Sequence, residues 1–127
     1  MPNKNKKQEV CVYGLIKNKN GETLFIKRAD NDTHPGLWEL PGGGVDFGED
    51  PKASVKREIE EETGIEVDVK DPVRVFSTIN DDKNKQTVRI VFSCTPYVLD
   101  KITLSSDHSN HNWILTDSLE SFTEKRM

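Results

Sequence analysis

The chain of 127 residues carries 18 Lys and Arg against 22 Asp and Glu, which gives a net charge of −4, and 33% of its residues are hydrophobic. This length fits one domain that can bury a core of its own. The acidic balance argues against a nucleic-acid polymer as a partner. No membrane span is expected, because the longest apolar stretch, residues 10–16, is far short of the roughly 20 residues required.

Residues 1–8 are predicted to form a flexible polar tail and residues 9–127 a single domain. The basic opening has no apolar core after its charges, so it does not resemble a secretory signal. Cys11 and Cys94 each stand alone among apolar and β-branched residues, which is typical of reduced thiols in strands rather than of a disulfide or a zinc site. Together these features predict a cytoplasmic protein.

Short runs rich in β-branched and aromatic residues predict strands, the first of which cover residues 9–17, 23–28 and 37–40. Asn20 and Gly21 form a strong hairpin signal and are expected to join the first two strands. Residues 29–36 carry Asn, Asp, Pro and Gly and are predicted to be a loop. The run 41–44, a proline followed by three glycines, is expected to be neither helix nor regular strand.

A helix is predicted over residues 51–63, because acidic residues precede a proline suited to the first turn and Gly64 supplies the stop. Ala53, Val55 and Ile59 are its expected core positions. Further strands are predicted over residues 65–69, 73–79, 87–99 and 113–115, with a polar turn at 80–85, a loop over about 100–110 and a short final helix opening at residues 116–117. The result is an α+β plan, in which a largely antiparallel or mixed sheet is interrupted by one central helix.

Three glutamates of this helix, Glu58, Glu61 and Glu62, fall within about 100° of one another on one face. Like charges at this spacing destabilise an isolated helix, so helix stability alone does not favour the cluster. A divalent cation would, because Mg²⁺ and Mn²⁺ prefer hard oxygen ligands. The alternative is an ordinary solvated acidic face. The glycine run just upstream, where backbone can approach a phosphate closely, favours the metal site.

The segment from Gly43 to Ile65 resembles the Nudix box. Five residues separate Gly43 from Glu49, and seven more separate Glu49 from the run REIEEETGI that starts at Arg57. Every position that the signature specifies is filled, and the preceding run WELPGG is also similar to the family's. The resemblance implies the Nudix fold, a mixed β-sheet sandwiched by helices (α/β/α). It also implies hydrolysis of a nucleoside diphosphate linked to a further group, by attack of water at phosphorus with help from Mg²⁺ or Mn²⁺.

By this resemblance, Glu58, Glu61 and Glu62 would bind the metal ion together with the Gly42 carbonyl. A helix that presents three acids usually needs one more group from elsewhere. Of the aspartates in the later loops, Asp107 is favoured, because Asp107-His108 before Trp113 resembles an acid–His pair before the last strand of the family. The alternative is an ordinary loop aspartate.

The same resemblance implies catalytic roles for Glu58, Arg57 and Glu61. Glu58 is the best candidate in the box for the general base, although the family does not always draw its base from the box. Arg57 would orient an acid, either Glu49 or Glu58, rather than touch phosphate. Residues expected to contact the substrate are Arg28, Gly43, Gly44 and His34. For Arg28 the alternative is a surface charge on a strand, and for His34 a loop histidine with no such contact is favoured.

Residues 77–85 contain neither the proline typical of ADP-ribose hydrolases nor the tyrosine typical of dinucleoside polyphosphate hydrolases. The leading expectation is therefore a MutT-like enzyme that cleaves a nucleoside triphosphate to monophosphate and pyrophosphate. Hydrolysis of ADP-ribose, a sugar nucleotide or a dinucleoside polyphosphate stays open as an alternative. So do a non-catalytic nucleotide-sensing module and a structural interaction domain with an acidic helix. The number of subunits is also open, with a homodimer among the alternatives.

Overall fold

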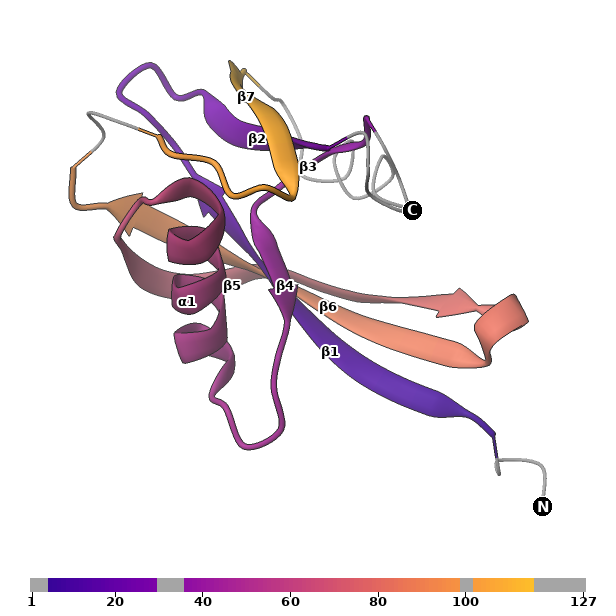
Figure 1. Ribbon diagram of the computed structural model, residues 1–127. Helices are drawn as coiled ribbons and strands as arrows, with labels where there is room; N and C mark the ends of the chain where they lie inside the picture. The colour runs from indigo at the N-terminus through magenta and orange to yellow at the C-terminus, as the bar shows by residue number, and fades with distance from the viewer. Residues whose placement is uncertain (1–4, 30–35, 99–101, 116–127) are drawn as a thin grey trace.

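The computed structural model describes residues 5–29, 36–98 and 102–115, which form two β-sheets and one α-helix (Figure 1). The strands are β1 (Lys7–Ile16), β2 (Thr23–Arg28), β3 (Trp38–Glu39), β4 (Gly42–Gly44), β5 (Val67–Asn80), β6 (Lys85–Pro96) and β7 (His108–Ile114). The helix is α1 (Pro51–Thr63), and a 3₁₀ turn, η1 (Asp81–Lys83), joins β5 to β6. The α+β plan is confirmed, whereas the predicted final helix lies outside the described residues.

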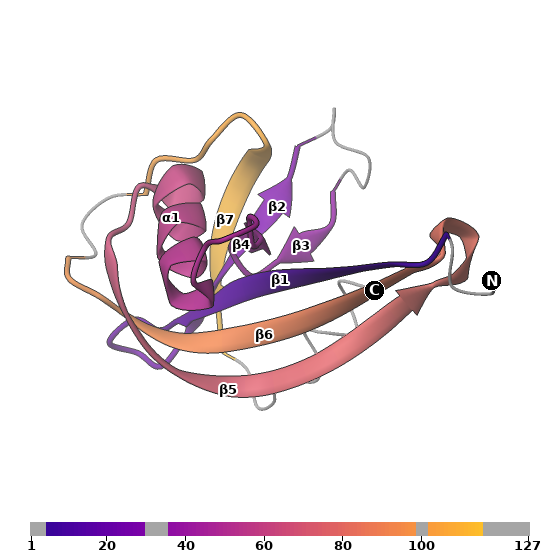
Figure 2. The ribbon, with the colours of Figure 1, turned by 90° about the horizontal axis from the view of Figure 1, so that it is seen from below.

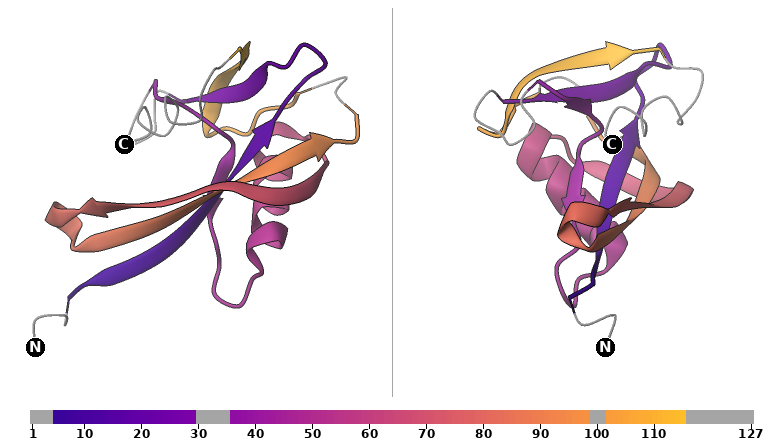
Figure 3. Two further views of the ribbon diagram at one scale, coloured as in Figure 1. Left: turned by 180° about the vertical axis from the view of Figure 1, so that it is seen from behind. Right: turned by 90° about the vertical axis from the view of Figure 1, so that its right-hand side faces the viewer.

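The larger sheet has the strand order β4-β1-β6-β5 and is mixed, because β1 and β6 run parallel while the other neighbours are antiparallel. The smaller sheet, β3-β2-β7, is antiparallel. Helix α1 lies against one end of the larger sheet, and β1, β5 and β6 extend well beyond it (Figure 2). Seen from behind and from the side, the smaller sheet lies across the same end (Figure 3). The helix and the smaller sheet therefore lie at the same end of the larger sheet.

Local signals at both ends set the length of α1, which has the predicted bounds. The Asp50 side chain caps the first turn by accepting a hydrogen bond from the Lys52 N–H. Gly64 ends the helix at φ 76°, a left-handed conformation that a residue with a side chain rarely adopts. Val55 and Ile59 are buried as expected, but Ala53 is exposed and Ser54 is buried instead. Ala53 lies six residues before Ile59, which turns it about 120° away from that side.

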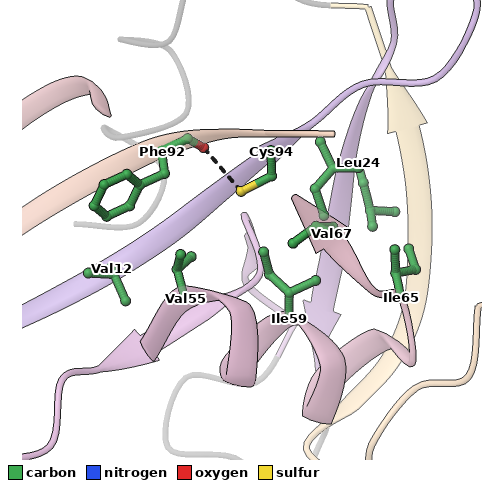
Figure 4. Close-up of a cluster of buried hydrophobic side chains, with 9 residues drawn as sticks. Val12, Leu24, Val55, Ile59, Ile65, Val67, Phe92 and Cys94 are labelled. Atoms are coloured by element: carbon green, nitrogen blue, oxygen red, sulfur yellow. Dashed lines mark hydrogen bonds between the residues drawn. The ribbon is translucent and has the colours of Figure 1, made fainter. Parts of the chain in front are cut away.

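The main core fills the space between α1 and the larger sheet. Val55 and Ile59 pack there with Val12, Val67 and Phe92 (Figure 4). Cys94 belongs to the same cluster, and its burial raises the pKa of the thiol to about 12, so the thiolate does not form near neutral pH. Both cysteines carry free thiols, as predicted. No α-helix among the described residues is long and apolar enough to cross a membrane.

The glycine run 42–44 is a strand, contrary to our prediction. It pairs antiparallel with β1, Gly42 opposite Tyr13 and Gly44 opposite Cys11. The prediction was wrong because long-range pairing overrides the low strand propensity of glycine. A Cβ at Gly42 would collide with the Val12 carbonyl oxygen, so the close approach of the two strands requires glycine there.

Three other strand predictions also differ from the structure. Residues 65–69 and 73–79 do not contribute separate strands, because β5 runs through Pro72 with shifts of register against β6. Strand β7 begins at His108, inside the predicted loop, because it pairs with β2. The Asn20-Gly21 turn forms, with Gly21 at φ 76°, but β1 and β2 enter different sheets and share only an isolated bridge between Lys17 and Thr23.

Candidate active site

The glutamates of α1 face the glycine strand β4. A Cβ built at Gly43 would lie 2.6 Å from the Glu58 carboxyl carbon, so the missing side chain leaves the space that this carboxylate occupies. The Gly42 N–H donates to Oε1 of Glu62 at 2.8 Å. Because the N–H and C=O of one residue in a strand point to the same side, the Gly42 carbonyl also lies on the edge of β4 away from β1. Two carboxylates and a backbone carbonyl thus converge on one edge of the sheet.

Arg57 holds the other carboxylates of the segment. Its guanidinium forms a two-bond fork with Glu49, Nε to Oε2 at 2.9 Å and Nη2 to Oε1 at 3.0 Å. Its Nη1 donates to Oε1 of both Glu58 and Glu61 at 3.0 Å. The Ser54 hydroxyl also donates to Glu49. The prediction that Arg57 orients Glu49 or Glu58 understates these contacts, because the structure shows both and adds Glu61.

The electrostatic environments of Glu49 and Glu58 differ. Hydrogen bonds from Arg57 and Ser54 lower the pKa of Glu49 to about 2. Burial instead raises the pKa of Glu58, and the neighbouring Arg57 only partly offsets this. Glu49 is therefore a firmly ionised anchor, whereas Glu58 is a carboxylate with an increased affinity for a proton, as a general base requires.

A cleft of about 1140 Å³ connects this acidic edge to the smaller sheet. Four of the predicted site residues line it together with Glu58 and Glu62, namely Gly42, Gly43, Gly44 and Arg28. Asp107 lines it as well, is exposed, and accepts a hydrogen bond from the Ala29 N–H through its backbone carbonyl. Glu61 is not among the lining residues, and His34 lies outside the described part of the chain.

The glutamates do not yet form a metal cage. Across residues 5–29, 36–98 and 102–115, no three His, Cys, Asp or Glu side chains come close enough together to hold a metal ion. The reason lies in their partners, since Arg57 draws Glu58 and Glu61 to itself while Gly42 holds Glu62. The ligand set Gly42, Glu58, Glu61, Glu62 and Asp107 therefore stays a prediction.

Two buried polar residues of the cleft, Glu39 and His108, were not among the predicted site residues. Oε1 of Glu39 accepts from Arg28 Nε at 3.0 Å, and its Oε2 lies 3.0 Å from His108 Nε2. The side chains of Glu39 and His108 are each only 3% exposed. A signal was available, because Glu39 is a charged residue between Trp38 and Leu40 in a predicted strand. Its partners come from separate strands and could not be identified from spacing.

Arg89 was also missed and lies on the floor of the cleft. It stands opposite Cys11 of β1 and Phe76 of β5 in the larger sheet. Its Nη1 donates to the Tyr13 hydroxyl and its Nε donates to Thr78 Oγ1 at 3.1 Å. A lone arginine between Val88 and Ile90 was the available signal. The cleft therefore combines an acidic edge with two arginines, Arg28 and Arg89, that suit an anionic ligand.

Comparisons with known proteins agree with this geometry. A family model described as the NUDIX domain matches residues 7–126. The chain is 36% identical over 110 residues to a MutT-like protein of Streptomyces ambofaciens, covering 87% of this chain and 66% of that one. It is 31% identical over 124 residues to the nucleoside triphosphatase NudI of Enterobacter sp. (strain 638), covering 89% of this chain and 86% of that one.

Other relatives are named differently. An ADP-ribose pyrophosphatase of Methanocaldococcus jannaschii is 41% identical over 83 residues, which are 65% of this chain but only 48% of that one. The chain thus spans less than two thirds of the length of the Streptomyces and Methanocaldococcus relatives. The crystal structure of the MutT protein from Methanosarcina mazei Go1 superposes with a TM-score of 0.77 at 35% identity, covering 91% of this chain and 80% of that one. This chain belongs to the NUDIX family and has its fold.

Proposed function

We propose that this protein is a divalent-metal-dependent hydrolase that cleaves a nucleoside triphosphate to a nucleoside monophosphate and pyrophosphate. The observation that carries the proposal is the contact between Gly43 and the Glu58 carboxylate at the edge of a cleft large enough for a nucleotide. Membership of the NUDIX family supports the reaction class. The relative named nucleoside triphosphatase NudI, of which the chain covers 86%, supports the triphosphate over ADP-ribose.

The residues present fit a hard divalent cation. The donor set predicted from the sequence consists of carboxylate and carbonyl oxygens, which are the ligands that Mg²⁺ and Mn²⁺ prefer. Gly42, Glu58, Glu61 and Glu62 would hold it, with Asp107 as the further ligand. When bound, such an ion neutralises phosphate charge and activates the attacking water.

The chain's own residues supply the remaining functions. Glu58 accepts the proton of the attacking water as the new oxygen–phosphorus bond forms and the anhydride bond to pyrophosphate breaks. Arg57 keeps Glu58 and Glu61 in place through the anchor Glu49. Arg28, which lines the same cleft, binds a phosphate, and Gly43 and Gly44 let the substrate approach the backbone.

The test compares Glu58→Gln with Glu60→Gln, which changes an exposed glutamate of the same helix. We expect Glu58→Gln to lower Mg²⁺-dependent pyrophosphate release at least about a hundredfold and Glu60→Gln to leave it unchanged. The substrates are a panel of nucleoside triphosphates, ADP-ribose, sugar nucleotides and dinucleoside polyphosphates. If the wild type releases phosphate or pyrophosphate from none of them, the protein is a nucleotide-sensing module and not an enzyme. A preference for another member of the panel would show that this compound, and not a nucleoside triphosphate, is the substrate.

Stability should separate this loss of activity from misfolding. A carboxyl group whose pKa is raised in the native state destabilises that state once the pH exceeds the ordinary carboxyl pKa of about 4.3. Burial raises the pKa of Glu58, so Glu58→Gln should melt at the same temperature as the wild type or higher at pH 7. An unfolded variant would show that Glu58 has a structural role instead.

We also propose a cytoplasmic location and no macromolecular partner beyond a second copy of the chain. The free thiols of Cys11 and Cys94 support the location. Sedimentation of the full chain at several concentrations measures the number of subunits.

A further inference from the structure

We propose that His108 is a positioning residue for substrate binding, which acts through Glu39 to hold Arg28 at the wall of the cleft. The three residues come from three neighbouring strands of the smaller sheet, β7, β3 and β2. They line the same cleft as Gly43 and Glu58. This inference rests on the proposed function only in that the ligand carries phosphate groups.

The distances define a chain of contacts through one carboxylate. Arg28 and His108 contact different oxygens of Glu39, Arg28 Nε at 3.0 Å from Oε1 and His108 Nε2 at 3.0 Å from Oε2. An ionised carboxylate only accepts hydrogen bonds, so the shared proton is carried by Nε2 of His108. Because both oxygens are held, the plane of the Glu39 carboxylate is fixed. This plane sets the direction in which the guanidinium of Arg28 points.

The exposed fractions of the three side chains show which of them faces the ligand. The side chains of Glu39 and His108 are each 3% exposed, whereas that of Arg28 is 23% exposed. Arg28 therefore reaches the cleft while the other two lie behind it. Nδ1 of His108 is buried and has no hydrogen-bond partner among the described residues, so Nε2 is the ring nitrogen through which this side chain acts on Glu39.

Without His108, the buried carboxylate of Glu39 would lose the contact at Oε2, so its plane would be held less firmly. Arg28 would then keep its charge, but its guanidinium would be directed less firmly toward the ligand. Such a change affects binding of the phosphate groups and leaves the groups around Glu58 in place. It should therefore appear in KM rather than in kcat.

The experiment compares His108→Leu, which removes the donor, with His108→Gln, whose amide can still donate to Glu39. His111→Leu, at an exposed histidine of the same strand, is the matched control. For the best nucleotide of the panel, we expect His108→Leu to raise KM about tenfold with kcat within about twofold of the wild type. His108→Gln should recover most of this loss, and His111→Leu should match the wild type.

A double-mutant cycle tests whether His108 acts through Arg28. In an Arg28→Ala background, adding His108→Leu should raise KM no further. Effects that multiply would overturn the proposal, as would a folded His108→Leu protein with unchanged KM. If His108→Leu does not fold, Glu39→Gln provides the same test, because its amide group can match only one of the two donors.

Inorganic tripolyphosphate with Mg²⁺ separates this inference from the proposed function. We expect it to raise the melting temperature of the wild type and to do so less for Arg28→Ala and His108→Leu. This result would support the inference even if no nucleotide on the panel were hydrolysed. Hydrolysis by the wild type with unchanged KM in both variants would overturn the inference and leave the function standing. A wild type that neither binds tripolyphosphate nor hydrolyses any nucleotide would overturn both.

Discussion

Arg57 and Glu49 form a two-bond ion pair, with Nε 2.9 Å from Oε2 and Nη2 3.0 Å from Oε1. Glu49 stands before the first turn of α1, and Arg57 lies eight residues later on the helix. The pair therefore ties the loop that follows β4 to the helix face that carries Glu58 and Glu61. It fixes the guanidinium so that its remaining nitrogen can hold those two carboxylates without a cation.

Replacing Arg57 with lysine should disable this arrangement although the charge is kept. An ammonium group is a point charge and cannot form the fork with Glu49 while also reaching Glu58 and Glu61. We expect Arg57→Lys to lower activity by about tenfold to a hundredfold, as is typical when a residue that orients ligands is lost. The measurement is kcat/KM under saturating Mg²⁺, with Lys56→Arg as a control at an exposed neighbouring position. Equal activity of Arg57→Lys and the wild type would contradict the role of the fork.

The ion pair also predicts how stability depends on pH. Arg57 and Ser54 lower the pKa of Glu49 to about 2. A carboxyl group with a lowered pKa stabilises the native state fully above its ordinary pKa of about 4.3, and this contribution is lost as the pH falls toward the native value. The wild type should therefore melt higher than Glu49→Gln at pH 7, and the difference should shrink between about pH 4.5 and pH 2. A difference that stays constant across this range would show that Glu49 stabilises the fold by packing instead.

The three glycines of β4 should respond differently to alanine. At Gly44 a Cβ meets no protein atom within 4 Å, so Gly44→Ala should keep the fold and kcat, and should raise only KM if the substrate approaches the backbone there. At Gly43 it would lie 2.6 Å from the flexible end of Glu58, so the variant should fold but lose activity as the carboxylate is displaced. At Gly42 it would meet the backbone of Val12, which cannot move aside, so this variant should be the least stable of the three. Melting temperatures, kcat and KM of the three variants test this order. A fully active Gly43→Ala variant would show that the space beside Gly43 is not needed to place the Glu58 carboxylate.

Features that depend on neighbouring residues were predictable from the sequence. Helix α1 has its predicted bounds because Asp50 and Gly64 set both ends through local hydrogen bonds. The acidic face was identified from helical spacing alone. The resemblance to the Nudix box implied that these acids share a site with Gly42, and the structure places Glu58 against Gly43 and Glu62 against Gly42.

Features that depend on pairing between distant segments were not predictable. Residues 42–44 become a strand only because Tyr13 and Cys11 of β1 lie beside them. The cluster of Arg28, Glu39 and His108 joins residues separated by 11 and 69 positions, so no local pattern marks it. Helical spacing also placed Glu61 with the other acids, but its exposed side chain turns to Arg57 instead of the cleft.

Asp107 provides the last prediction, because its side chain is the candidate ligand from outside the box. The pairing of β7 with β2 carries it into the cleft, next to the buried His108. Its backbone already bonds Ala29, so Asp107→Asn should not alter the fold. If the carboxylate supports the metal site or the base, the variant should need a higher Mg²⁺ concentration for half-maximal turnover, by about tenfold or more. Asp71→Asn, at an exposed position of β5 that does not line the cleft, is the matched control, and undiminished turnover and metal affinity of Asp107→Asn would remove Asp107 from the site.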